Sequence, residues 1–248
     1  MGRSRQAMWW ADYFDDAYFH LHDPLFPETE SRHEVGAMLE LLGLPIGARV
    51  LDAPCGWGRH AALFRDAGYR VVGADISIPL LCRARERGPA LPLAAVDLRA
   101  LPFRDASFDA VLNVFTSLGL LLDDAEDAHV LGEARRVLRA GGGFLLESMH
   151  RDEVIAQYAE RDAWTLPDGT EVSVRRRFDP VTGVSRERLV WRRGDESGEK
   201  RHALRLRTAT EIDRLLKLAG FADVDYFGEW DGRPLRRDSS RVIAVAWR

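Results

Sequence analysis

The residues best suited to chemistry form one short segment, Val50-Leu-Asp-Ala-Pro-Cys-Gly-Trp-Gly-Arg-His60, followed at some distance by Asp75. The segment predicts a buried strand, a turn built on Gly56 and Gly58, and the first turn of a helix. A second apolar strand, from Tyr69 to Ala74, ends at Asp75. In a parallel sheet, this layout places a nucleotide-like ligand across the carboxyl ends of the strands, with the acid facing the ribose hydroxyls.

Two ligands fit this turn. Gly56-x-Gly58-x-x-Ala61 matches the dinucleotide pattern, which tolerates alanine at its third position. The second ligand is S-adenosylmethionine, and Asp52, at the tip of the first strand, distinguishes it from a dinucleotide. A carboxylate there would repel the pyrophosphate that a dinucleotide places at the helix N-terminus. S-adenosylmethionine carries an α-ammonium and a sulfonium in that region instead, so an acid becomes favourable.

A third acid, Asp97, closes the next predicted strand and could accept from an adenine amino group. Any single aspartate at a strand end could equally be a helix cap or a turn former. Three of them in phase with a strand–helix repeat favour a ligand with an amine at one end, a ribose diol and an amino-purine at the other.

The chain resembles the class I S-adenosylmethionine-dependent methyltransferases over nearly its whole length. The residues that carry the resemblance are Val50 to His60, Val71 to Ser77, Asp97 to Phe103, Ser107 to Gly119 and Arg136 to Gly143. The Asp-x-Pro-Cys-Gly-x-Gly-Arg-His variant is similar to a bacterial subgroup that mostly lacks assigned substrates. Ala140 stands where family members often have proline, which affects only a turn.

The layout and the resemblance together imply S-adenosyl-L-methionine as cofactor. We expect it to contact Tyr13, Tyr18, Asp52, Ala53, Pro54, Cys55, Gly56, Gly58, Asp75, Ile76, Asp97, Leu98 and Asn113.

Composition sets further bounds on the function. With 248 residues, 46% hydrophobic and 30% charged, the chain can bury one sizeable core as an ordinary globule. Its formal net charge of −4 makes it a poor generic nucleic-acid binder. Arg175–Arg177 and Arg192–Arg193 could still form a local patch, although a solvated strand face is the favoured interpretation.

Compartment and metal content follow from a few residues. Cys55 and Cys82 are expected to be free thiols in a reducing cytoplasm, and no apolar run is long enough to span a bilayer. His20-x-His22 lacks the spacing of a metal site on a helix, so we expect no metal.

The hydrophobic pattern predicts an α/β fold, a Rossmann-like doubly wound sheet with helices on both faces. The resemblance implies seven strands, the last of them antiparallel. From about Trp164 to Arg207 the hydrophobic period drops to two, which predicts an antiparallel β insertion after strand five. Ser31-x-x-Glu34 and Thr208-x-x-Glu211 are expected capping boxes that open helices.

We therefore divide the chain into three parts. Residues 1–30 are an aromatic segment that could close as a lid over the methionine end of the ligand or simply pack on the sheet. Residues 31–150 and 208–248 form the cofactor-binding unit. Residues 151–207 form the insertion, on the acceptor side or as a homodimer contact.

Methyl transfer needs alignment and exclusion of water more than a fixed set of catalytic groups, so no motif locates a catalytic residue. His150 and Glu147, at the end of strand five, are the candidate general bases. A surface histidine at a helix start is nevertheless the favoured interpretation of His150, and a structural role is likewise favoured for Glu147. We expect a small-molecule acceptor methylated on nitrogen or oxygen, and no membrane partner. A tRNA or protein methyltransferase and a non-catalytic binding module are the alternatives.

Overall fold

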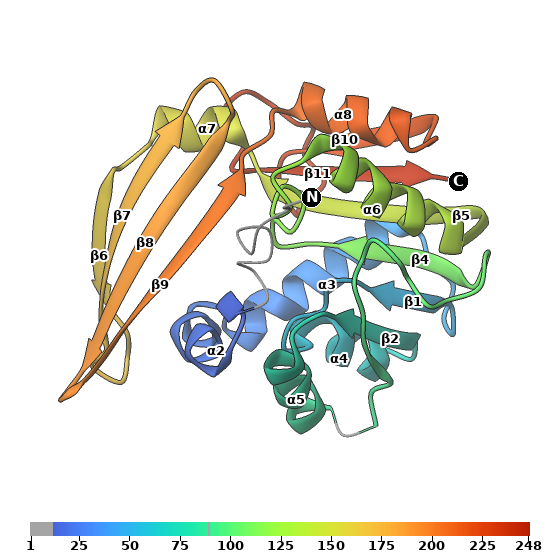
Figure 1. Ribbon diagram of the computed structural model, residues 1–248. Coiled ribbons are helices and arrows are strands. Elements are labelled where there is room, and N and C mark those ends of the chain that lie inside the picture. The colour runs from blue at the N-terminus through green and yellow to red at the C-terminus, as the bar shows by residue number, and fades with distance from the viewer. Residues whose placement is uncertain (1–11, 89) are drawn as a thin grey trace, which may run out of the picture.

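A computed structural model describes residues 12–88 and 90–248, which form two sheets (Figure 1). The larger sheet has seven strands in the order β10-β11-β5-β4-β1-β2-β3. The strands are β1 (Arg49–Asp52), β2 (Arg70–Asp75), β3 (Leu93–Ala95), β4 (Phe108–Asn113), β5 (Leu138–Met149), β10 (Asp223–Phe227) and β11 (Arg241–Trp247). Strands β1 to β5 pair in parallel, whereas β11 runs antiparallel to both β5 and β10. The predicted Rossmann-like sheet with an antiparallel last strand is confirmed.

Helices cover both faces of this sheet because its strands are apolar on both sides. On one face, α3 (Glu28–Leu42) and α4 (Arg59–Asp66) bury Met38 and Phe64 against the strands. On the other, α6 (Asp124–Val137) and α8 (Ala209–Leu218) bury Leu131 and Leu216. A further helix, α5 (Ile78–Arg87), follows β2 and packs beside α4.

The two expected capping boxes have different outcomes. At Thr208 the reciprocal pair with Glu211 is present and opens α8, as predicted. At Ser31 the prediction is wrong, because α3 already begins at Glu28, directly after Pro27. Ser31 and Glu34 therefore lie inside the helix, where both are buried and face α4. The Ser31-x-x-Glu34 pattern therefore forms a contact between α3 and α4 and does not cap a helix.

The insertion after β5 begins with α7 (Arg151–Ala156) and forms a four-stranded antiparallel sheet in the order β6-β7-β8-β9. Its strands are β6 (Arg161–Thr165), β7 (Glu171–Asp179), β8 (Val184–Arg193) and β9 (Glu196–Arg205). Alternate residues such as Val172, Val174 and Leu189 are buried, which fits the predicted period of two. The predicted antiparallel insertion is thus present.

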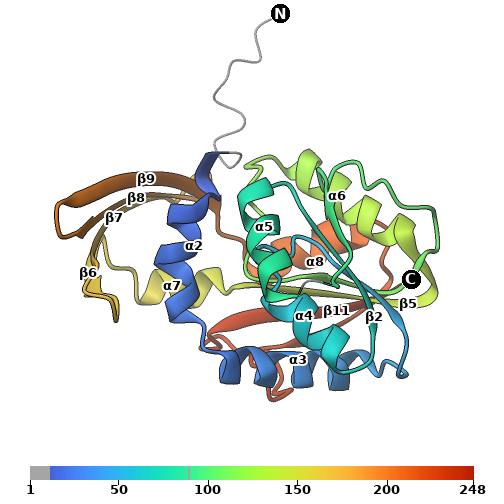
Figure 2. The ribbon, with the colours of Figure 1, turned by 90° about the horizontal axis from the view of Figure 1, so that it is seen from below.

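The N-terminal helix α2 (Asp16–His22), continued by the short η2 (Asp23–Leu25), lies between the two sheets (Figure 2). Leu21 packs into the apolar face of the inserted sheet, and Tyr18 packs against Trp57 of the β1–α4 turn. Residues 1–11 of the expected lid lie outside the described residues. The remainder joins the inserted sheet to the turn that follows β1.

Candidate functional site

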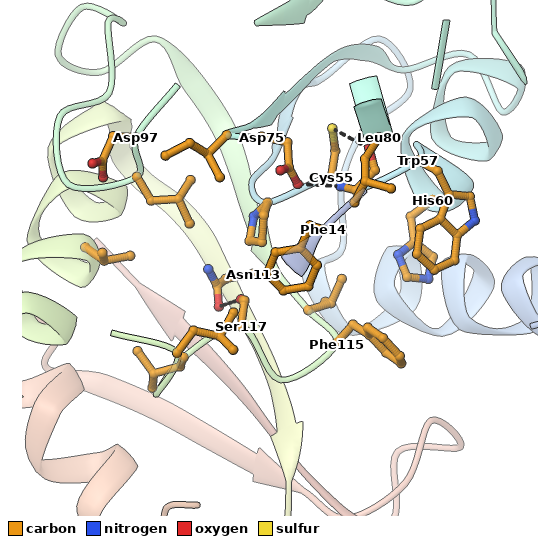
Figure 3. A pocket seen from close by; sticks show the side chains of 18 of the residues that line it. Phe14, Cys55, Trp57, His60, Asp75, Leu80, Asp97, Asn113, Phe115 and Ser117 are labelled. Atoms are coloured by element: carbon orange, nitrogen blue, oxygen red, sulfur yellow. Dashed lines mark hydrogen bonds between the residues drawn. The ribbon is translucent and has the colours of Figure 1, made fainter. Parts of the chain in front are cut away.

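A cavity opens at the carboxyl ends of β1, β2 and β4, beneath the N-terminal segment (Figure 3). The space between its lining residues is about 1090 Å³, part of which is open to solvent. The lining includes Phe14, Tyr18, Pro54, Cys55, Gly56, Trp57, Arg59, His60, Asp75, Ile76, Leu80, Asp97, Leu98, Asn113, Phe115, Ser117 and Asp127. Residues far apart in the sequence therefore meet at one sheet edge, as expected of the strand ends.

The turn after β1 needs its two glycines for different reasons. Gly56 and Gly58 have φ of +52° and +72°, a region that other residues rarely adopt. A Cβ on Gly58 would also lie 2.9 Å from the Cβ of Ala84, so this glycine lets α4 approach α5. Gly58 and Ala53 support the turn from behind, whereas Pro54, Cys55 and Gly56 line the cavity.

Asp75 joins this turn to the end of β2. Its carboxylate accepts from the N–H of Gly56 (2.8 Å) and from the N–H of Ser77 (2.9 Å). Burial raises the pKa of Asp75, and these backbone hydrogen bonds oppose the shift. Because a carboxylate offers about four lone-pair sites, acceptor capacity remains for a ligand in the cavity that Asp75 lines.

Asp52 lies behind the turn and is 1% exposed. Among residues 12–88 and 90–248, neither of its carboxylate oxygens has a hydrogen-bond partner of ordinary geometry. Burial raises the pKa of Asp52 to about 7, against the opposing charge of Arg59. A buried carboxyl group without a partner is costly, and a positive charge nearby would stabilise its ionised form.

Asp97, the third acid, is oriented by a salt bridge. The Arg99 guanidinium donates to both of its oxygens, with Nε–O distances of 3.0 and 3.1 Å. These hydrogen bonds lower the pKa of the Asp97 carboxyl, which therefore carries a full charge at neutral pH. Arg99 also donates to Glu126 of α6 at 2.7 Å, so the loop after β3 is tied to that helix.

Asn113, at the end of β4, connects the turn to the loop on the acceptor side. Its amide donates to the carbonyl of Ala53 (3.0 Å), and its Oδ1 accepts from the Ser117 hydroxyl (2.7 Å). In Figure 3 these two side chains point toward one another at the cavity wall. The loop between them places Phe115 and Thr116 at φ of +64° and +55°, a strained conformation for residues other than glycine.

The aromatic N-terminal segment meets the cavity through Tyr18 and Phe14. Tyr13, which we also expected there, is absent from the lining, and its hydroxyl lies 3.3 Å from His202 of the inserted sheet. The two adjacent residues therefore point to different places. The ring of Tyr13 lies against the inserted sheet, and the ring of Phe14 lines the cavity. Lys200 of β9 donates to the Tyr13 carbonyl at 2.8 Å and so fixes this segment from the far side.

Sequence reasoning missed a buried polar cluster between α3 and α4. Glu34 accepts from both Arg59 and His60, with a distance of 2.7 Å to His60 Nε2, and Arg59 also donates to Ser31. Burial alone would raise the pKa of Glu34, but the hydrogen bond from His60 and the charge of Arg59 lower it to about 2. Burial lowers the pKa of His60 to about 4, so this histidine is neutral. The signal was Ser31-x-x-Glu34, which we had assigned to a cap.

Neither expected general base reaches the cavity. Glu147 is buried, and its side chain accepts from the N–H of Phe115 at 2.7 Å, which holds the strained loop. His150 is also buried and donates from Nδ1 to the carbonyl of Ser239 (3.0 Å). Because β5 continues as far as Met149, His150 directly follows the strand and precedes α7.

The fold and this cavity define a Rossmann-like protein that binds a nucleoside at its strand ends. A family model described as "Methyltransferase domain" matches residues 50–142. The malonyl-[acyl-carrier protein] O-methyltransferase of Salmonella typhimurium is 37% identical over 217 residues, covering 87% of this chain and 81% of that protein. Across four other curated relatives the match is shorter and covers between 42% and 55% of their length, so there the chain spans about half of each relative.

Two solved structures share the fold. The CcbJ methyltransferase from Streptomyces caelestis has a TM-score of 0.80 at 19% identity, covering 95% of this chain and 97% of that one. The S-adenosylmethionine-bound CalS10, an amino pentose methyltransferase from Micromonospora echinaspora, has a TM-score of 0.73 at 24% identity, covering 94% and 97%.

The chain therefore belongs to the class I S-adenosylmethionine-dependent methyltransferases, and S-adenosylmethionine is its cofactor. The site fits that molecule, because the partnerless carboxyl group of Asp52 suits a cationic ligand and the Asp75 carboxylate keeps free acceptor positions beside the turn. Within the described part of the chain, no helix is both long and apolar enough to cross a membrane.

Proposed function

We propose that this protein transfers the methyl group of S-adenosylmethionine to a nitrogen or oxygen atom of a small molecule. The enclosure of the cavity is the observation that carries the proposal. Aromatic rings of the N-terminal segment, Phe14 and Tyr18, cover one side, and the Phe115 loop covers another. The inserted sheet holds the N-terminal segment in place from behind. Such a site suits a compact acceptor better than a folded polymer.

Three strand ends would hold the cofactor. Asp75 has acceptor positions left for the ribose hydroxyls, and Asp97 with Leu98 lines the part of the cavity that suits the adenine. Asp52 would stabilise the cationic methionine end through the turn in front of it. When bound, the cofactor supplies an activated methyl group on its sulfonium. The protein's own contribution is to align the acceptor and to exclude water.

His60 is our candidate for orienting the acceptor, in place of Glu147 and His150. It lies on the cavity wall beside Trp57 (Figure 3). Because the Glu34 carboxylate can only accept, the hydrogen on His60 is on Nε2, and Nδ1 keeps a lone pair. A neutral Nδ1 can accept the N–H or O–H of an acceptor and direct the nitrogen or oxygen lone pair toward the methyl group.

The relatives' names agree with either acceptor atom. The Salmonella typhimurium protein is named an O-methyltransferase, whereas CalS10 is named an amino pentose methyltransferase. Both names support a nitrogen or oxygen acceptor without choosing between them.

A labelled-methyl screen tests the proposal. The protein is incubated with [methyl-³H]S-adenosylmethionine and separate pools of small amines, small hydroxyl compounds, tRNA and proteins. We expect label in a small-molecule pool, and much less label at subsaturating S-adenosylmethionine when Asp75→Asn replaces the wild type. Label confined to tRNA or protein would refute the small-molecule acceptor. Tight cofactor binding with no label in any pool would indicate a non-catalytic binding module.

With an acceptor in hand, the role of His60 becomes testable. His60→Gln keeps a donor near Glu34 but removes the Nδ1 acceptor. We expect a higher KM for the acceptor, a lower kcat, and unchanged affinity for S-adenosylmethionine. If His60→Gln weakened the affinity for S-adenosylmethionine as much as it raised the KM for the acceptor, His60 would be only structural. A drop in thermal stability that explains the whole effect would show the same.

A further inference from the structure

The outward face of the inserted sheet carries a row of arginines that crosses all four strands. In the β-sheet register Arg161 is paired with Arg175, Arg175 with Arg188, and Arg188 with Arg201. Arg177 and Arg186 form a second such pair one step along β7 and β8. Because side chains alternate along a strand, all of these point away from the buried face that holds Val174 and Leu189. With Arg192, seven exposed arginines share one face.

The carboxylates on this face are fewer than the arginines. Glu171 is paired directly with Arg192 across β7 and β8. Glu199 serves both Arg188 and Arg201, at 2.6 Å from the latter. Asp179, at the end of β7, accepts from the N–H of its own turn residue Val181 at 2.9 Å. Hydrogen bonds within this turn and the charge of Arg186 lower the pKa of Asp179. Four of the arginines have no salt bridge within the described residues. They are Arg161 on β6, Arg175 on β7, and the pair Arg177 and Arg186.

This arrangement costs stability. Like charges placed directly opposite each other on neighbouring strands are destabilising. The chain as a whole is acidic, with a net charge of −4, so an excess of arginine on one sheet face runs against the general composition. Glu171 and Glu199 offset only part of the charge of the seven arginines on this face. We attribute the remaining excess of positive charge to a partner that neutralises it.

The shape of the face indicates what that partner is. A shallow hollow lies over β6, β7 and β8 next to the arginine row. Its lining includes the small outward side chains of Ala163, Ser173 and Val190, and Glu171 at one end. Neighbouring strands are about 4.8 Å apart, so the arginines recur at that spacing. Residues three or four apart on one side of a helix are about 5–6 Å apart, a closely similar repeat.

We propose that this face is a docking surface for an acidic amphipathic helix of a partner protein. The helix would lie across the strands, with its carboxylates on the arginine row and its small or apolar side in the hollow. Arginine suits this task because its planar guanidinium binds carboxylates bidentately. The proposal concerns a protein contact beyond methyl transfer and holds whichever acceptor the cavity takes.

Other occupants fit less well. Single-stranded nucleic acid binds through stacking on aromatic rings, but the aromatic residues of these strands, Trp164, Phe178 and Trp191, alternate onto the opposite face. A long polyanion would also meet the acidic remainder of the chain. A symmetric dimer through this face would set one arginine row against another, so we do not propose the homodimer contact expected for the insertion.

The test uses the full chain and a fluorescein-labelled peptide of about 18 residues, five helical turns, with glutamates at every third or fourth position and alanine between them. A glutamine version of the same peptide is the matched probe. Binding is followed by anisotropy at low salt and at about 0.3 M NaCl. We expect the wild type to bind only the glutamate peptide, and salt to weaken it.

Arg175→Ser combined with Arg188→Ser should weaken this binding by about tenfold or more. The control is Arg214→Ser with Arg237→Ser, two exposed arginines outside the inserted sheet. Cofactor affinity should be unchanged in both, since none of the four lines the cavity. The first variant should melt no earlier than wild type, because it removes like-charge contacts.

Each of four results would overturn the proposal. The first is that the glutamine peptide binds as tightly as the glutamate peptide, and the second is that the control variant loses as much affinity as the Arg175→Ser, Arg188→Ser variant. The third is tighter binding of a short double-stranded RNA than of the glutamate peptide. The fourth is self-association in the ultracentrifuge that the Arg175 and Arg188 changes abolish.

Discussion

Asp52→Asn isolates the energetic cost of the partnerless carboxyl group behind the turn. Burial raises the pKa of Asp52 to about 7, from an ordinary value of 3.8. The folded protein therefore binds more protons than the unfolded chain between these pH values, and this group's contribution to stability falls as pH rises through that window. At 1.36 kcal/mol per pKa unit the full effect is about 4 kcal/mol, of which about 2.5 kcal/mol develops between pH 5 and pH 8.

Urea unfolding of the cofactor-free protein at pH 5 and pH 8 measures this difference. We expect the wild type to lose about 2.5 kcal/mol more than Asp52→Asn over that interval. Other buried carboxyl groups, such as Glu147, titrate in both proteins and cancel in the comparison. Saturating S-adenosylmethionine should reduce the difference, because a cationic ligand stabilises the ionised carboxylate. Equal pH slopes for the two proteins would refute the reasoning.

Two further changes test the structure around the site. Glu34→Gln removes the buried charge that Arg59 and His60 share, and should cost about 3 kcal/mol of unfolding free energy at pH 7. The difference in unfolding free energy between the wild type and Glu34→Gln should shrink as the pH falls below 4.5, toward the native Glu34 pKa of about 2. An equal difference at pH 3 and pH 7 would contradict this prediction. Gly58→Ala should cost about 1–3 kcal/mol and weaken cofactor binding, because its Cβ would meet Ala84 at a positive φ. In the control Gly36→Ala, the added Cβ would meet open space in α3, so its stability should equal or exceed that of the wild type. Equal melting temperatures for Gly58→Ala and Gly36→Ala would contradict the packing argument.

Local patterns in the sequence predicted the two sheets, whereas the seven strands and the antiparallel last strand were implied by the family resemblance. Apolar strands alternating with helices gave the parallel sheet, and the change to a period of two near Trp164 gave the inserted sheet. Strand ends were less predictable. We expect Glu147 at the end of strand five, but β5 begins at Leu138 and runs to Met149, because pairing with β4 and β11 extends it beyond its apolar centre.

The site was predictable where the chemistry is local to a strand tip. Asp75 and Asp97 do line one cavity, since parallel strands end at the same edge. The Glu34 cluster was not predictable, because its partners come from another helix and its sequence pattern also describes a cap. The choice of Phe14 over Tyr13 depends on how the segment packs against the inserted sheet, which no local pattern specifies.

Titration calorimetry tests the central claim, that the acids at these strand ends hold S-adenosylmethionine. The wild type should bind S-adenosylmethionine, and more tightly than NADH. Asp75→Asn should weaken the affinity for S-adenosylmethionine by about tenfold to a hundredfold, as expected for hydrogen bonds to a charged group. Unchanged affinity in the variant, or tighter binding of NADH by the wild type, would contradict the account.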